Sequence, residues 1–70
     1  MIIPSPTDFN EWNAGKIGDD ALVRIEAFFA DMLKGAEALG PRYALATMPL
    51  RAERDAAQAM LSRRREPQFR

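Results

Sequence analysis

The 70-residue sequence predicts an all-α fold, in which a short N-terminal helix precedes a long antiparallel helical hairpin. Three observations favour this fold. Apolar residues recur at helical spacing over residues 19–39, and an alanine-rich run continues the helical pattern over residues 48–65. No segment alternates apolar and polar residues as a half-buried strand would. A chain of this length is sufficient for one domain, so we expect residues 1–70 to form a single helical unit.

The first predicted helix covers residues 6–14. Two prolines keep residues 1–5 extended, because proline fixes its own φ and disfavours helix in the residue before it. Ser5 or Thr7 is suited to cap the helix, and Gly15 ends it. Within this helix Phe9 and Trp12 lie three residues apart and so share one face, which we expect to anchor it to the rest of the protein.

The second predicted helix covers residues 19–39. Asp19 or Asp20 is expected to cap it, and Gly40-Pro41 follows its end. At about 100° per residue, its apolar side chains fall within an arc of roughly 140°. This predicted core face comprises Ala21, Leu22, Ile25, Phe28, Phe29, Met32, Leu33, Ala36 and Leu39.

The third predicted helix covers residues 48–65, with Thr47 as its cap and Pro49 in its first turn. Residues 41–48 remain ambiguous, since they are compatible with one or two helical turns. Glu53 falls inside the apolar arc of this helix, so either part of that arc is exposed or Glu53 has a basic partner. Residues 66–70 are expected to form a frayed tail.

The formal net charge is zero, yet the two halves of the sequence carry opposite charge. Residues 1–39 hold three basic and seven acidic groups, a net charge of −4, and residues 40–70 hold seven arginines and three acids, a net charge of +4. Such an asymmetry marks either an electrostatic binding surface or an attraction between the halves, within one chain or across a dimer.

The residue inventory argues against catalysis. The chain has no cysteine and no histidine, which excludes disulfides, thiolate or imidazole metal ligands and an imidazole base. Its acids do not follow the spacing of a calcium loop, and its hydroxyl residues have no evident activating base. We therefore expect no enzyme activity, no metal and no cofactor.

The N-terminus lacks the basic flank and apolar run of a signal peptide, and the amphipathic helix over 19–39 has an acidic polar face unsuited to a membrane surface. We therefore expect a cytoplasmic protein with no membrane association. The abundance of alanine and arginine is typical of a bacterial or phage sequence.

The most prominent candidate site is Arg63-Arg64-Arg65, supported by Arg51 and Arg54. Guanidinium groups suit an acidic protein surface or a phosphate backbone, because each can contact two oxygens at once. We favour an acidic protein partner over nucleic acid, since the acidic front half would repel a duplex and no known nucleic-acid-binding motif accompanies the arginines. The simplest alternative is a solvated helix end whose cations complement the helix dipole.

Two aromatic residues are further candidates for partner contacts. Phe28 lies at the edge of the apolar arc, about 100° from Phe29, and Tyr43 lies beside Arg42 in the connecting segment. The bulk of the aromatic residues in so small a protein is expected to be core.

These observations predict a protein-binding module, such as a small inhibitor, adaptor or assembly factor. Two alternatives stay open. One is a small nucleic-acid-binding regulator that uses the same arginines. The other is a structural subunit of a larger helical assembly, with Ala52, Ala56 and Ala59 as its interface. The fold has an alternative as well, a hairpin that completes its core only as a homodimer.

Overall fold

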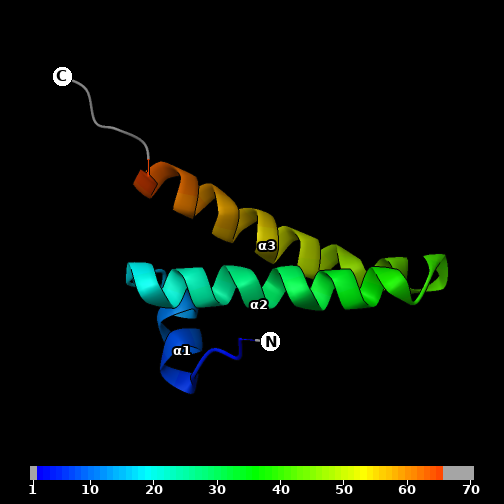
Figure 1. Cartoon of the computed structure of the whole chain (residues 1–70), viewed down its shortest axis with the longest axis horizontal. Coiled ribbons are helices and arrows are strands. Elements are labelled where there is room, and N and C mark those ends of the chain that lie inside the picture. Colours follow the sequence, from blue (N-terminus) through cyan, green and yellow to red (C-terminus); the bar gives the residue numbers. More distant parts are fainter. Residues whose placement is uncertain (1, 66–70) are drawn as a thin grey trace.

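The computed structural model describes residues 2–65, and within them it confirms the all-α prediction. Three α-helices follow one another: α1 (Pro6–Ala14), α2 (Asp19–Ala38) and α3 (Ala44–Arg65), with a short 3-10 turn, η1 (Pro41–Tyr43), between α2 and α3. α2 and α3 form an antiparallel hairpin whose far ends separate, and α1 crosses the N-terminal half of α2 (Figure 1). The predicted tail, residues 66–70, lies outside the described residues.

α1 begins with a reciprocal capping box between Ser5 and Asp8. The backbone N–H of Asp8 donates to the Ser5 hydroxyl oxygen at 3.2 Å, and the backbone N–H of Ser5 donates to the Asp8 carboxylate at 3.1 Å. This geometry satisfies two N–H groups that a helix start otherwise leaves without partners. Of the two predicted caps, Ser5 is therefore the cap used. The helix ends at Gly15, whose φ of 74° is left-handed and suits glycine.

The start of α2 differs from the prediction. Gly18 is the N-cap and makes no side-chain cap, whereas Asp19 and Asp20 lie inside the first turn. There their charges still oppose the positive end of the helix dipole, so they stabilise the helix without capping it. The predicted end of the helix agrees to within one residue, because α2 ends at Ala38 and Leu39 is its C-cap.

The start of α3 also differs, since the helix begins at Ala44 and not at residue 48. The predicted cap, Thr47, is buried inside the helix and its hydroxyl donates to the Ala44 carbonyl at 2.8 Å. Pro41 instead begins the 3-10 turn that precedes α3. A first-turn residue has no helical acceptor for its N–H, so proline loses no hydrogen bond there. Pro49 then lies within the helix, where it has no N–H to donate to the backbone carbonyl of Leu45. Leu45 is exposed to solvent.

The core lies where α2, α3 and α1 meet. Leu22 and Ile25 of α2 and Ala57 of α3 are fully buried, and Ile17 and Ala21 complete this cluster. Phe9, Trp12, Phe29, Met60 and Leu61 pack around it and are partly buried. Leu33, farther along α2, is also buried.

The predicted core face of α2 is correct in its N-terminal half and at Leu33, and it is wrong at Met32 and Leu39. Leu39 is 62% exposed and Met32 is 40% exposed. The reason is visible in Figure 1, where α1 covers only the half of α2 that begins at Asp19. Beyond that half, α3 covers one side of α2, and no second helix within residues 2–65 covers the other side.

The predicted anchors, Phe9 and Trp12, join α1 to α2 through aromatic contacts. Phe9 packs edge-on against Phe28 with the ring centroids 5.4 Å apart, and Trp12 lies 6.0 Å from Phe29. The Trp12 indole N–H also donates to the Glu53 carboxylate of α3 at 2.7 Å. Glu53 is exposed, so this part of the arc is open to solvent, as one of the two alternatives required. The partner of Glu53 is an indole and not a cation.

An ion pair with a buried carboxylate is the second contact that holds α1 on α2. Asp8 is 4% exposed and accepts two hydrogen bonds from the Arg24 guanidinium, at 2.8 and 3.0 Å. Hydrogen bonding from Arg24, followed by that from the Ser5 backbone, lowers the pKa of Asp8 from 3.8 to about 2. The same carboxylate thus completes the capping box of α1 and holds α1 on α2.

Replacing Leu22 by alanine should destabilise the fold by about 2–5 kcal/mol, because the change leaves a cavity in a core too small to compensate. Leu45→Ala is the matched control, since Leu45 is 82% exposed where Leu22 is 0% exposed. We expect the control to change the free energy of unfolding by less than about 0.5 kcal/mol. Urea titrations of both variants measure the difference, and equal losses would contradict this core.

Asp8 should also make stability depend on pH in the acid range. A carboxyl whose pKa is lowered by folding stabilises the native state fully above its unfolded pKa, and this contribution is lost as the pH falls from 3.8 towards about 2. Asp8→Asn should therefore be less stable than the wild type at about pH 5, and the gap should narrow by about pH 2.5. Urea midpoints at both pH values measure this gap, and a constant gap would rule out the ion pair as its cause.

Candidate protein-binding surfaces

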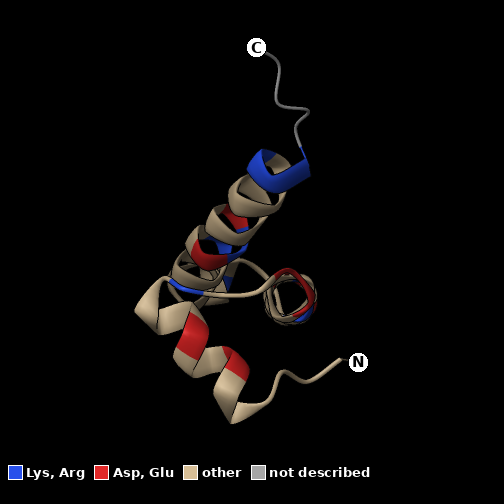
Figure 2. Cartoon of the chain, turned by 90° about the vertical axis from the view of Figure 1, so that its left-hand side faces the viewer, with Lys and Arg blue, Asp and Glu red and all other residues tan. Residues whose placement is uncertain are grey.

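The three consecutive arginines at the end of α3 do not form one patch, because successive helical residues diverge by about 100°. Figure 2 shows this turn as a basic end of α3 that extends away from α1 and α2. The Arg64 guanidinium pairs with Asp19 of α2 at 2.7 Å, and Arg65 turns into a cleft between α2 and α3. Arg63 is exposed and has no ion pair with any residue from 2 to 65.

Arg51 and Arg54, the other two predicted site residues, also contact acids. Arg51 pairs with Glu37 at 2.8 Å, and Arg54 pairs with the adjacent Asp55 at 2.8 Å. Exposed pairs of this kind contribute little to stability, so an incoming carboxylate can replace the internal one at small cost. The structure therefore distributes the five predicted arginines over several sides of α3, and three of them have internal partners.

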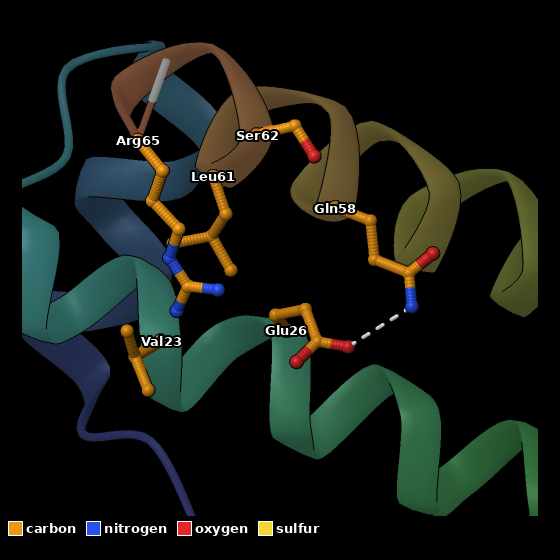
Figure 3. Close-up of a pocket in the computed structure, with 6 residues that line it drawn as sticks. All are labelled: Val23, Glu26, Gln58, Leu61, Ser62 and Arg65. Atoms are coloured by element: carbon orange, nitrogen blue, oxygen red, sulfur yellow. Dashed lines mark hydrogen bonds between the residues drawn. The ribbon is translucent and has the colours of Figure 1, made fainter. Parts of the chain in front are cut away.

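A cleft of about 300 Å³ opens where α2 and α3 separate. In Figure 3 the Arg65 guanidinium lies over Val23, while the Glu26 carboxylate turns towards Gln58, whose side-chain amide donates to it at 3.3 Å. A carboxylate thus shares the cleft with the guanidinium, which weakens the attraction of this cleft for an anion. Its full lining comprises Val23, Glu26, Gln58, Leu61, Ser62 and Arg65.

The two aromatic candidates differ in their surroundings. Tyr43 lies in η1 and is 40% exposed, so its ring is available at the hairpin turn. Phe28 is half-buried and packs between Phe9 and Phe29, with centroid distances of 5.4 and 5.6 Å. The packing of Phe28 gives it a structural role in the docking of α1.

The structure shows a surface of which the sequence pattern indicates only a part, the alanine stripe. We call it the outer face of α3, and every side chain in it is exposed. Large apolar residues begin it, since Leu45 is 82% exposed and Met48 is 63% exposed. Alanines form its middle, and Arg63 lies at its C-terminal end. The outer face comprises Leu45, Met48, Pro49, Ala52, Ala56, Ala59 and Arg63.

A third helix that begins at residue 48, as the sequence predicts, contains only part of the outer face. That boundary excludes Leu45 from the helix, and only the alanines then form a stripe. Once α3 begins at Ala44, Leu45 and Arg63 are 18 residues apart and therefore lie on the same side of the helix, since 18 residues make five turns. The spacing of Leu45 and Arg63 is therefore a property of the sequence, but it indicates a shared face only if the helix includes both residues.

The described part of the chain holds no group of three or more acidic side chains placed to bind a metal ion. None of its helices is long and apolar enough to span a bilayer. Comparisons of the chain with protein-family models, with curated proteins and with solved structures produced no match.

Proposed function

We propose that this chain is a non-enzymatic protein-binding module that presents the outer face of α3 to a partner protein with an acidic group opposite Arg63. The observation that carries the proposal is the exposure of Leu45 and Met48 at the start of a face that remains uncharged until Arg63. Burying one such large side chain against a partner is worth about 1.5–3 kcal/mol, so two of them supply an apolar anchor. Arg63 then supplies a charged contact with an acidic group.

The division of α3 into two faces supports the same proposal. Its inner face, with Ala57 and Leu61, contributes to the core, so partner binding on the opposite face requires no rearrangement of the fold. The internal ion pairs of Arg51 and Arg64 neutralise part of the positive charge, which disfavours a nucleic-acid partner relative to a protein. A small cytoplasmic inhibitor, adaptor or assembly factor fits this division.

Ala56→Glu should abolish co-purification of the partner from the native host, because it places a charge in the middle of the outer face. Ala38→Glu is the matched control, an exposed alanine in α2. The control should retain the partner at the wild-type level. Retention by both variants would contradict the proposal, as would the recovery of nucleic acid in place of protein in the wild-type sample.

A further inference from the structure

The outer face of α3 has the residue spacing that one partner helix needs. From Leu45 the face continues at 49, 52, 56, 59 and 63, which alternates steps of four and three residues. This alternation forms a straight seam along a helix and is the spacing by which a second helix packs alongside it. The seam is about 27 Å long, and its centre is made of alanines, which allow a neighbouring backbone to approach closely.

Acidic residues lie beside the middle of the seam, and a basic residue lies at its end. Asp55 lies on one side of the middle and Glu53 on the other, about 80–100° from the seam centre, and Arg63 lies at the end. Both acids already have partners, because Asp55 pairs with Arg54 and Glu53 accepts the Trp12 indole N–H. The face is therefore apolar along its length, acidic beside its middle and basic at its end.

A second copy of the chain does not complement this pattern. In an antiparallel two-fold pairing centred between Ala52 and Ala56, the two copies of Asp55 approach each other, as do the two copies of Glu53. Arg63 of each copy would then face the apolar Leu45 of the other. In a parallel pairing the two copies of Arg63 meet in the seam. Either arrangement places like charges together, which destabilises helix pairs.

We infer that the outer face of α3 receives an α-helix of a different protein, with basic residues beside its middle and an acidic residue at the end that meets Arg63. The inference rests on the proposed function and adds the form and charge pattern of the partner. Charge complementarity with Asp55, Glu53 and Arg63 selects this occupant over a second copy.

Two synthetic 21-residue amphipathic helices test this charge pattern. Both have the same leucine and alanine face, and they differ only in their flanking charges. The first has lysines beside its middle and glutamate at the end, and the second has the reversed arrangement. In NMR titrations of the labelled full chain, the first helix should bind at least about fivefold more tightly, with shifts confined to the outer face of α3.

Two variants and one control, Ala38→Glu, relate the binding to individual residues. Arg63→Glu should remove most of the preference for the first helix, and Ala56→Glu should prevent binding of both helices. Ala38→Glu should bind them as the wild type does. Equal affinity for the two helices, or no binding of either, overturns the inference.

The proposed function can survive that failure. If Ala56→Glu still abolishes co-purification of the native partner while neither synthetic helix binds, the outer face is a binding surface for a partner of another form. If the wild-type chain sediments as a dimer that Ala56→Glu dissociates, the occupant is a second copy and the inference is overturned. If neither helix binds and Ala56→Glu retains the partner, both proposals fail.

Discussion

The contact of Ala57 with Leu22 and Ile25 is the constraint on which the rest of the structure depends. All three side chains are fully buried, and they join the two long helices at the centre of the core. An alanine at such a contact lets α3 approach α2 closely, yet it buries little apolar area of its own. Further apolar area comes from the half-buried side chains around this contact, among them Phe9 and Trp12 of α1.

The same constraint explains how the fold uses its charges. α1 contacts the core through two aromatic side chains, and its position also depends on the carboxylate of Asp8, which completes the capping box with Ser5 and binds Arg24. Farther along the hairpin, Glu37 pairs with Arg51 and Asp19 pairs with Arg64. The opposite charges of the two halves of the sequence are thereby partly matched within one molecule. The outer face of α3, which ends at Arg63, takes no part in these pairs.

Sequence patterns were sufficient where one local rule decides the structure. Ser5, Gly15 and the helical spacing over residues 19–39 each predicted their element correctly, because capping, left-handed φ and amphipathicity are local properties. The errors at Thr47 and Leu39 have a tertiary cause. Thr47 is buried in the hairpin, and Leu39 extends past the region that α1 covers. The error at Thr47 also affected the candidate site. The outer face includes Leu45 only when α3 begins at Ala44, so the predicted helix start hid its apolar end.

The most direct test of this account compares two adjacent alanines of α3. Ala56 is exposed on the outer face, whereas Ala57 is 0% exposed in the core. The measurement is the free energy of unfolding of Ala56→Glu and Ala57→Glu, obtained from urea titrations followed by circular dichroism. We expect Ala56→Glu to remain within about 0.5 kcal/mol of the wild type and Ala57→Glu to be unfolded, because an unpaired charge cannot be buried there. Equal stability of the two variants would contradict the assignment of the two faces of α3.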